Sequence, residues 1–376
     1  MNGRAPVRDA AARARFGALA QRSIEVIRRH QAPSGAYLAA PNLSVYRYSW
    51  LRDGSFIADA MSRAGEVESA AAFLDWCRGV IERRTEQVDA LVRRRQAGEA
   101  TNPAEFLHTR FAVDGRESDE EWSNQQLDGY GAWLWALSAH LARVGADSES
   151  HRFASAVEAT ARYLVAFWDH PCYDCWEENG GQVHVATLAA IAAGLRVASE
   201  WPGVPGTVRQ AAASTVQAII RRVRADGVRD GHLVKWLGGS ELDASLLFCA
   251  VPYRLFEPDD PLMVATVSAL SPDLAHGGVH RYRADVFYGG GEWILLAAVL
   301  GSYDIAIGDI DAAWHQLEWV AAHADENDHL PEQVSGHLLH PDSLAEWQER
   351  WGPAARPLLW SHAMFLDLYG ELHARL

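Results

Sequence analysis

Two glutamates in separate loop-like segments have the residue type and surroundings that acid–base chemistry needs. Glu177 lies in the segment WEENGG, between Trp176 and Glu178. The indole lowers the local polarity and the second carboxylate disfavours ionisation, so this setting favours the protonated form of a general acid. Glu332 lies in LPEQ, where the amide of Gln333 offers a donor and an acceptor to a water molecule. We therefore predict that Glu177 is a general acid and Glu332 a general base.

Glycoside hydrolysis requires such a pair, since one carboxyl group protonates the departing oxygen and the other activates water. Taken alone, Glu177 is better explained as part of a surface glutamate pair and Glu332 as a loop residue that caps a helix. The adjacent Arg52 and Asp53 can bind neighbouring sugar hydroxyls as donor and acceptor, although Asp53 could also be a helix N-cap. We expect Asp128 and Asp243 to cap or brace helices.

Tryptophan is abundant, with 15 residues, and its flat faces suit the CH surface of a sugar ring. Rings on helical stripes, such as Trp76 and Trp314, are predicted to pack in the core. Indoles beside charged or glycine residues at loop–helix junctions are predicted to form pocket walls. These are Trp50, Trp122, Trp176, Trp236, Trp293 and Trp360. The chemistry of these residues points to a carbohydrate ligand.

Helical periodicity recurs along nearly the whole chain, whereas the alternating pattern of strands hardly appears. The connections between the predicted helices alternate between tight and long. Tight connections join antiparallel neighbours, so six helical pairs with all long loops at one end predict an all-α, (α/α)6 barrel. The predicted helices lie near 7–30, 54–63, 66–97, 125–143, 147–168, 184–200, 206–225, 240–252, 260–270, 291–304, 309–323 and 357–374.

The six long loops of such a barrel should build one active site, because function concentrates on loops held by a rigid scaffold. The candidate residues above all lie in or beside these loops. We expect residues 1–376 to form a single catalytic domain, without an N-terminal β-sandwich or a carbohydrate-binding module.

Charge and hydropathy exclude several classes of partner. The 376 residues include 34 Lys plus Arg and 49 Asp plus Glu, a net charge of −15 without a basic stripe, so nucleic acid is a poor partner. No apolar run approaches the roughly 18 residues of a membrane span, and the N-terminus has no secretory pattern. We expect a cytoplasmic protein without metal or cofactor. Cys172 and Cys175 form a CxxC that we expect to be two reduced thiols.

Six motifs, in order, resemble the catalytic domain of glycoside hydrolase family 15, the glucoamylase family. They are YRYSWLRDGS, QQLDGYG, the WEE of DCWEENGG, ELDASLL, RYRADVFYGGGEW, and LPEQ followed by LLWSHA, between about 46 and 363. The resemblance implies an (α/α)6 barrel that hydrolyses α-glucosides from the non-reducing end with inversion, releasing β-glucose. An inverting mechanism would place the two carboxyl groups about 6.5–9.5 Å apart.

The resemblance also implies roles for individual residues. Glu177 matches the family's general acid and Glu332 its general base, while Tyr46 matches a tyrosine near the catalytic water. The matches that imply sugar binding are Arg52 and Asp53 for the released glucosyl unit, Trp122 and Trp360 as pocket aromatics, and Glu178 and Arg281 for the next sugar.

Two departures from the family refine these expectations. The missing β-sandwich and starch-binding module make the chain similar to compact intracellular members that cleave short imported oligosaccharides such as isomaltose. We expect isomaltose first and maltose second, with trehalose as a competitor. Phe287 stands where glucoamylases often have tyrosine. A phenol there could hydrogen-bond to Tyr46, so we hypothesise that Tyr46 is freer to share the proton-accepting role with Glu332.

Other classes of protein stay open. A sugar epimerase or isomerase on the same barrel would use histidines, and His280 and His362 are the ones close to the motif loops. A sugar-binding protein would have little need for both glutamates. The linkage preference depends on how the outer subsite is shaped, and the oligomeric state cannot be read from the sequence. The residues expected at that subsite are Trp122, Glu178, Lys235, Trp236 and Arg281.

Overall fold

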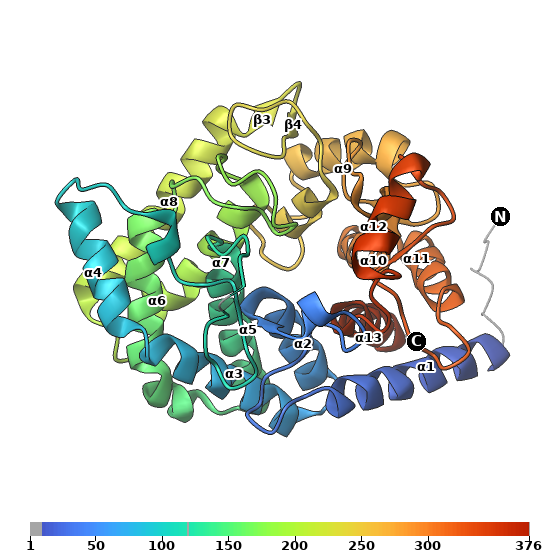
Figure 1. The fold of residues 1–376 in the computed structure, drawn as a ribbon, viewed down its shortest axis with the longest axis horizontal. Helices are drawn as coiled ribbons and strands as arrows, with labels where there is room; N and C mark the ends of the chain where they lie inside the picture. Colours follow the sequence, from blue (N-terminus) through green and yellow to red (C-terminus); the bar gives the residue numbers. More distant parts are fainter. Residues whose placement is uncertain (1–9, 119, 376) are drawn as a thin grey trace.

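Two concentric rings of helices make up the computed structural model, which describes residues 10–118 and 120–375 (Figure 1). In the inner ring each helix contacts the next, and α13 returns to α2. The inner helices are α2 (Leu51–Arg63), α5 (Asp128–Val144), α7 (Val185–Glu200), the 3-10 helix η4 (Ala244–Cys249), α10 (Ile294–Ile307) and α13 (Leu359–His373). The outer helices are α1 (Ala10–Arg29), α3 (Val67–Glu82), α6 (Ala154–Phe167), α8 (Gly206–Asp226), α9 (Pro261–Leu274) and α11 (Ile310–Ala322). The predicted (α/α)6 barrel is confirmed.

The two rings follow from the distribution of apolar residues. In the outer helix α8 the buried residues recur at helical spacing along one face, from Ala212 through Val216 and Ile219 to Val223. In the inner helices α10 and α13 most positions are buried, on all sides of the helix. A helix that is apolar all round has to lie inside, and a one-faced helix packs against it from outside.

Glycines bring the inner helices α5 and α7 into close contact. A Cβ at Gly131 would lie 2.2 Å from the carbonyl oxygen of Ala190, and one at Gly194 would lie 2.7 Å from the Cα of Gly131. Both positions therefore require glycine. The close packing of the two backbones fixes the start of α5, beside which several site residues lie.

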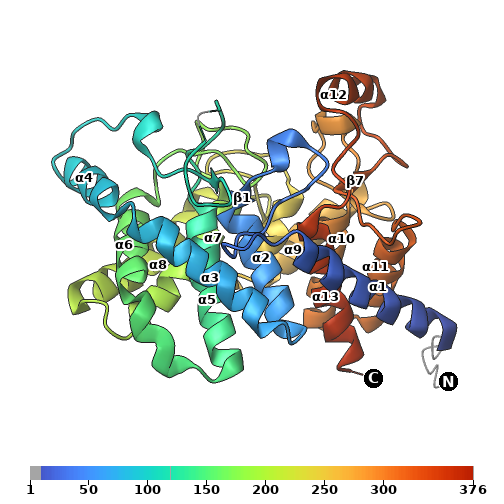
Figure 2. The ribbon, with the colours of Figure 1, turned by 60° about the horizontal axis from the view of Figure 1, so that its bottom comes forward.

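The long connections lie at one end of the barrel, where short strands tie them together (Figure 2). β1 (Ser49–Trp50) pairs with β2 (Arg110–Phe111), and β6 (Glu292–Trp293) pairs with β5 (Val279–His280) and β7 (Gln333–Val334). All these pairs are antiparallel, as is the pair of β3 (Val228–Arg229) and β4 (His232–Leu233). The three-stranded sheet joins two long loops that carry predicted site residues.

Two predicted helices are wrong in extent. The segment 66–97 is not one helix but two, α3 and α4 (Thr85–Gln96), because the chain turns at Arg84 (φ −112°, ψ 12°) and α4 packs on α6. The segment 240–252 forms only η4. Asp243 accepts a hydrogen bond from the amide of Ser245 at its start, and Pro252 has no amide hydrogen with which to continue a helix.

Further differences concern short elements. The predicted helix 147–168 begins as a 3-10 helix, η3 (Asp147–Phe153), and the first predicted helix has its residues 7–9 outside the described chain. The helix α12 (Leu344–Trp351) was not predicted. No helix within the described residues has the length and apolar character for crossing a membrane. The remaining 3-10 helices are η1 (Ser44–Tyr46), η2 (Pro103–Glu105), η5 (Phe287–Gly289) and η6 (Pro341–Ser343).

Candidate active site

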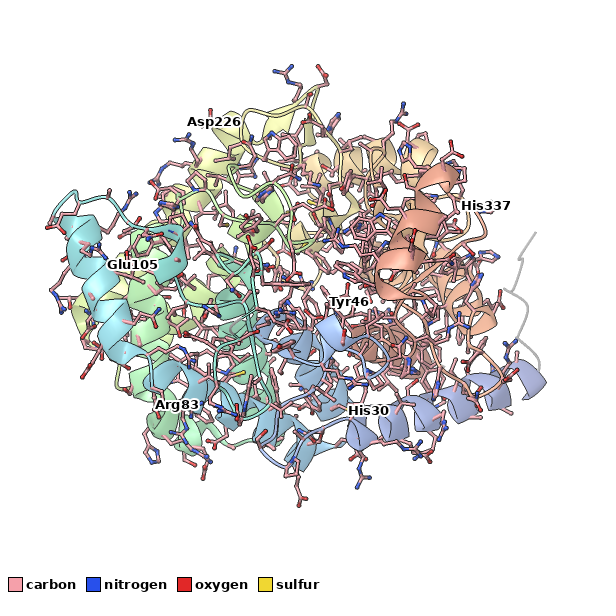
Figure 3. The ribbon with its side chains drawn as sticks, viewed as in Figure 1. His30, Tyr46, Arg83, Glu105, Asp226 and His337 are labelled. Carbon is pink, nitrogen blue, oxygen red and sulfur yellow. The ribbon has the colours of Figure 1, made fainter. Side chains whose placement is uncertain are left out.

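A pocket of about 400 Å³ lies at the loop end of the barrel. Tyr46, one of its lining residues, lies near the centre of the ring in Figure 3. The loops bring nearly all the predicted site residues to this pocket. Those that line it are Tyr46, Trp50, Arg52, Asp53, Trp122, Trp176, Glu177, Glu178, Arg281, Trp293, Glu332 and Trp360.

Glu177 is held in the left-handed region of the backbone (φ 68°) by the loop between α6 and α7. The indole Nε1 of Trp50 donates to its Oε1 at 2.6 Å, and the amide of Gln126 donates to the same oxygen at 3.1 Å. Both bonds reach Oε1, so Oε2 is the oxygen through which a proton can pass to a ligand. The sequence singled out the QQLDGYG segment but missed Gln126, whose amide touches the candidate acid.

Glu332 immediately precedes β7 and is only 2% exposed. The Tyr46 hydroxyl donates to its Oε1 at 2.9 Å, while Oε2 is buried without a hydrogen-bond partner. Burial raises the pKa of Glu332 to about 7, against the lowering effects of the Tyr46 hydrogen bond and the Arg281 charge. A carboxyl group with such a pKa and a vacant oxygen is suited to accept a proton from water.

Arg52 and Asp53 lie side by side in the first turn of α2. Arg52 Nη1 donates to Gln126 Oε1 at 2.8 Å and to Asp128 Oδ2 at 3.1 Å, so Asp128 holds the guanidinium of Arg52 in place. Arg52 Nε lies 3.3 Å from Asp53 Oδ2, and neither atom has a hydrogen-bond partner. Burial raises the pKa of Asp53 to about 6, opposed by Arg52. Asp53 is not the N-cap, which is Trp50.

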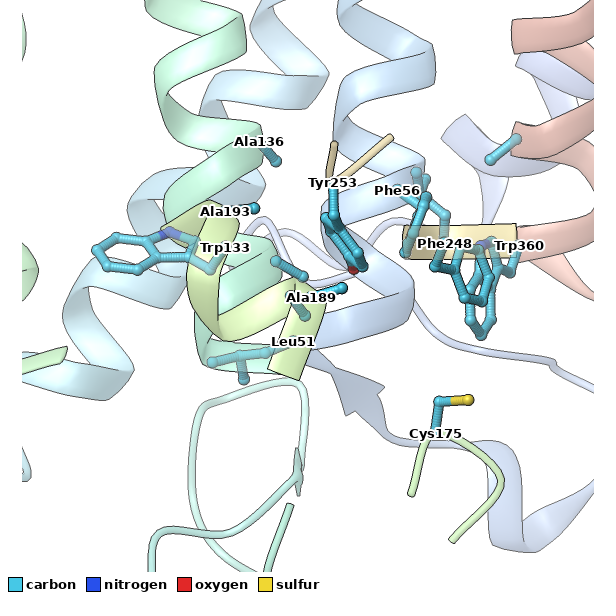
Figure 4. Packing of buried hydrophobic residues seen from close by; sticks show 14 of the residues in the cluster. Leu51, Phe56, Trp133, Ala136, Cys175, Ala189, Ala193, Phe248, Tyr253 and Trp360 are labelled. Atoms are coloured by element: carbon cyan, nitrogen blue, oxygen red, sulfur yellow. The ribbon is translucent and has the colours of Figure 1, made fainter. Parts of the chain in front are cut away.

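Aromatic rings form the walls and close the bottom of the pocket. The ring of Trp360 stacks on Phe248, with centroids 6.2 Å apart and planes at 14°, and both contact Phe56 (Figure 4). Phe56 and Tyr253 also line a second cavity at the other end of the barrel. The buried cluster of Phe56, Phe248, Tyr253 and Trp360 therefore separates the two cavities.

Trp122 forms another part of the wall. The Arg110 guanidinium lies 3.7 Å from the centroid of its ring, and Trp50 contacts it edge-on at 6.1 Å. The indole nitrogens of Trp122 and Trp360 are buried without a hydrogen-bond partner, and both rings line the pocket. These two N–H groups are free to donate to hydroxyl groups of a bound sugar.

Arg281 and Glu178 form a charged part of the pocket wall. Arg281 is 3% exposed, donates through Nε to Asp285 Oδ2 at 2.7 Å, and lies through Nη2 3.4 Å from Glu178 Oε1. The Tyr282 hydroxyl donates to Glu178 Oε2. Burial raises the pKa of Glu178, although Arg281 lowers it. Asp285 and Tyr282 thus orient the two residues predicted to meet the next sugar.

The helix α12 contributes three pocket residues that sequence reasoning missed: Trp347, Arg350 and Trp351. Figure 2 shows α12 beyond the loop end of the barrel. The ring of Trp347 contacts Phe287 edge-on, with centroids 4.9 Å apart. The spacing of four residues between the two tryptophans, which places them on one helical face, was the available signal.

Three predicted site residues do not line the pocket. Gln333 faces a neighbouring cavity, and its Oε1 accepts a hydrogen bond from the amide of Gly291 at 3.0 Å. That carbonyl oxygen is committed to the backbone because β6 and β7 pair at this point. Trp236 packs edge-on against His184. Lys235, also expected at the outer subsite, is buried beneath the loop that carries Glu177.

The two histidines considered for epimerase chemistry are structural. His362 is fully buried, contacts Ser23 Oγ at 2.9 Å and accepts a hydrogen bond from the Leu330 amide at 3.0 Å. Burial lowers its pKa to about 3, so it is neutral. His280 is 1% exposed and contacts the carbonyl oxygen of Gly290 at 3.0 Å. Neither histidine lines the pocket.

Cysteine chemistry and metal binding find no support at this site. Cys172 and Cys175 are both buried free thiols, as predicted. In the described part of the chain, no three His, Cys, Asp or Glu side chains are grouped as metal ligands would be. That the reaction needs neither metal nor cofactor stays a prediction.

A pocket with two candidate catalytic carboxyl groups, an Arg–Asp pair and indole walls is the kind of site found in glycoside hydrolases. Comparison with known proteins gives the same class, because a family model described as "Glycosyl hydrolases family 15" matches residues 14–306. The chain belongs to glycoside hydrolase family 15.

Two relatives and one solved structure illustrate this membership. An isomaltose glucohydrolase from Kribbella flavida is 50% identical over 96% of this chain and 94% of that protein. A trehalase from Mycolicibacterium smegmatis is 28% identical over 76% of this chain and 46% of its own length. A glycosidase variant solved in complex with glucose is 48% identical, covers 97% of this chain and 99% of its own, and has a TM-score of 0.94.

Proposed function

We propose that this protein is an exo-acting α-glucosidase that hydrolyses short α-glucosides from the non-reducing end and releases β-D-glucose with inversion. The observation that carries this proposal is the convergence of Glu177, Glu332 and the Arg52–Asp53 pair in one pocket. Isomaltose is the first substrate we propose and maltose the second. The similarity to an isomaltose glucohydrolase over nearly the whole chain supports this order.

In the proposed reaction Glu177 donates its proton to the glycosidic oxygen as the bond to the anomeric carbon breaks. Water attacks that carbon from the opposite face, and its proton passes to Glu332. Arg52 and Asp53 hold hydroxyls of the glucosyl unit with Nε and Oδ2, two atoms that form an ion pair with each other but make no hydrogen bond within the protein. Tyr46 donates a hydrogen bond to Glu332 and shares the proton-accepting role as a relay, taking up the proton of the water while its own hydroxyl proton passes to Glu332.

Exo-action follows from the shape of the site. The aromatic cluster of Phe56, Phe248, Tyr253 and Trp360 blocks the barrel axis, so a glucan chain cannot pass through the pocket. The glucosyl unit at the end of the chain is therefore the one that reaches Glu177 and Glu332. Residues of α12 extend the pocket outward and are proposed to contact the leaving sugar.

Further parts of the proposal concern organisation and location. We propose that the barrel is a single catalytic domain that acts on short sugars, without a β-sandwich or carbohydrate-binding module in residues 1–376. A cytoplasmic location fits an enzyme that cleaves imported disaccharides. Gln333 was expected to bind the catalytic water, but with its carbonyl oxygen bound to Gly291 only its NH2 group is left for this role.

Proton NMR of the purified protein tests the proposal. Isomaltose, maltose and trehalose are supplied in parallel, and the first glucose anomer to appear is recorded. We expect cleavage to be fastest with isomaltose and β-glucose to appear first. Initial α-glucose would contradict the roles of Glu177 and Glu332. Fastest cleavage of trehalose would favour a trehalase, an activity carried by a relative that is only 28% identical.

A further inference from the structure

Lys235 is the only lysine in the chain and is buried behind the loop that carries Glu177. Its Nζ lies 2.9 Å from Asp243 Oδ2 and 3.4 Å from Asp174 Oδ2, and 3.5 Å from the centroid of the Tyr282 ring. The residue is 4% exposed and does not line the pocket. Burying a charge costs free energy unless the charge is well paired, so we looked for what the Lys235 ammonium stabilises at this position.

Both carboxylates paired with Lys235 hold the loop on either side of Glu177. Asp174 Oδ1 accepts hydrogen bonds from the backbone amides of Trp176 at 3.0 Å and Glu178 at 2.9 Å. The indole Nε1 of Trp176 donates to Asp243 Oδ1 at 3.0 Å. The residues before and after the candidate acid are therefore each tied to a carboxylate that Lys235 neutralises.

A third support runs through Tyr282. Its ring lies over the ammonium of Lys235, and its hydroxyl donates to Glu178 Oε2. His184 cannot replace the ammonium, since burial lowers its pKa and keeps it neutral, with Nδ1 4.0 Å from Asp174 Oδ2. One ammonium thus fixes Asp174, Asp243 and Tyr282 together.

The backbone conformation of Glu177 is one that its loop would not adopt without these contacts. Glu177 has φ 68°, and a residue with a side chain is rarely found there unless the surroundings impose it. The amides that Asp174 binds belong to the two neighbouring residues, so the constraint acts directly across this position. Loosening it would misplace the carboxyl group relative to the glycosidic oxygen.

We propose that Lys235 is a positioning residue, which holds Glu177 in place to protonate the leaving group without itself touching the sugar. The inference rests on the proposed function, in which Glu177 is the general acid. It predicts that loss of Lys235 slows only the cleavage of substrates whose leaving group needs a proton in order to depart.

Kinetics with two substrates test the inference. Cleavage of isomaltose needs a proton on the departing oxygen, whereas α-glucosyl fluoride loses fluoride ion without one. For Lys235→Met we expect kcat on isomaltose to fall by about 100-fold, as misplacement of a catalytic group by 1 Å can cause. On the fluoride we expect a loss below about tenfold, with KM for either substrate little changed, because only the acid-dependent step is affected.

A second variant and a matched control keep the test independent of folding. Asp174→Ala removes the carboxylate that accepts hydrogen bonds from the amides of Trp176 and Glu178, while the ion pair between Lys235 and Asp243 remains. This variant should also lose activity on isomaltose much more than on the fluoride. Arg143→Met breaks a partly buried ion pair with Asp59, 2.7 Å long, on the helix α5, about 30 positions before the acid loop. It should lower the melting temperature and leave the ratio of the two activities unchanged.

The outcomes separate the two proposals. Equal losses on both substrates in Lys235→Met and Asp174→Ala would overturn the positioning role and leave a structural one. Glu177→Gln serves as the reference, because it should abolish isomaltose cleavage and spare the fluoride. If Glu177→Gln does not discriminate between the substrates, the proposed function itself fails. If it does and the Lys235 and Asp174 variants do not, only the present inference fails.

Discussion

Replacing Glu332 by glutamine should stabilise the folded protein at neutral and alkaline pH, although it removes the proposed base. In the folded state the pKa of Glu332 is about 7, whereas the ordinary value is 4.5. Between these pH values the folded protein binds a proton that the unfolded chain has lost, so the stability of the wild type falls as pH rises. Glutamine does not ionise, so the stability of the Glu332→Gln variant does not fall with pH for this reason.

The size of the effect follows from the gap between the two pKa values. At about 1.4 kcal/mol per pH unit, the gap from 4.5 to about 7 corresponds to about 3 kcal/mol once Glu332 is ionised. Glutamine is nearly isosteric, and its carbonyl oxygen can still accept the hydrogen bond that Tyr46 donates to Oε1. A cavity or a lost hydrogen bond therefore does not offset the gain.

Urea unfolding at two pH values measures this gain. We expect Glu332→Gln to exceed the wild type by less than about 1 kcal/mol at pH 5 and by about 3 kcal/mol at pH 8. The control is Glu349→Gln, an exposed carboxylate on α12, which should follow the wild type at both values. Parallel stability curves for Glu332→Gln and the wild type would show that this buried carboxyl group ionises like an ordinary one, and would refute the reasoning.

Three further predictions concern catalysis. The value of kcat/KM on isomaltose should rise through about pH 7, because Glu332 must lose its proton to act as a base; a profile flat between pH 6 and 8 would contradict its raised pKa. Phe287→Tyr should change the pH–rate profile by restraining Tyr46, and an unchanged profile would count against a shared base. Trp351→Ala should raise KM for isomaltose by about tenfold with kcat largely kept, since a sugar-contacting ring is lost. A fall in kcat alone would remove Trp351 from the substrate site.

Motifs and periodicity were sufficient to predict the barrel and most of its pocket. Glu177 and Glu332 lie within long loops and the Arg52–Asp53 pair lies at the start of α2, and alternating connections place these loops and this helix start at one end. Local patterns failed where a tertiary contact decided the outcome. The predicted helix 66–97 has an unbroken helical pattern, but α4 turns away to pack on α6.

Contacts between distant residues could not be read from spacing. The indole of Trp50 reaches Glu177 across 127 positions, and Tyr46 reaches Glu332 across 286. The residues next to each glutamate in the sequence do not indicate which distant side chain will hydrogen-bond to it. Gln333 is the opposite case, a residue whose position in the sequence was misleading. Its place beside Glu332 suggested a catalytic role, but the pairing of β7 with β6 brings its carbonyl oxygen to the backbone amide of Gly291.

The choice of lysine at position 235 makes chemical sense only in three dimensions. The other 33 basic residues are arginines, which composition alone attributes to codon usage. A guanidinium is planar and presents its donors in a fixed fork, whereas an ammonium is a compact charge whose three donors can turn toward separate acceptors. At this site Asp243, Asp174 and the ring of Tyr282 surround one nitrogen within 2.9–3.5 Å. Arginine would keep the charge but not this geometry, so Lys235 is required for the shape of the acid loop and not only for its electrostatic balance.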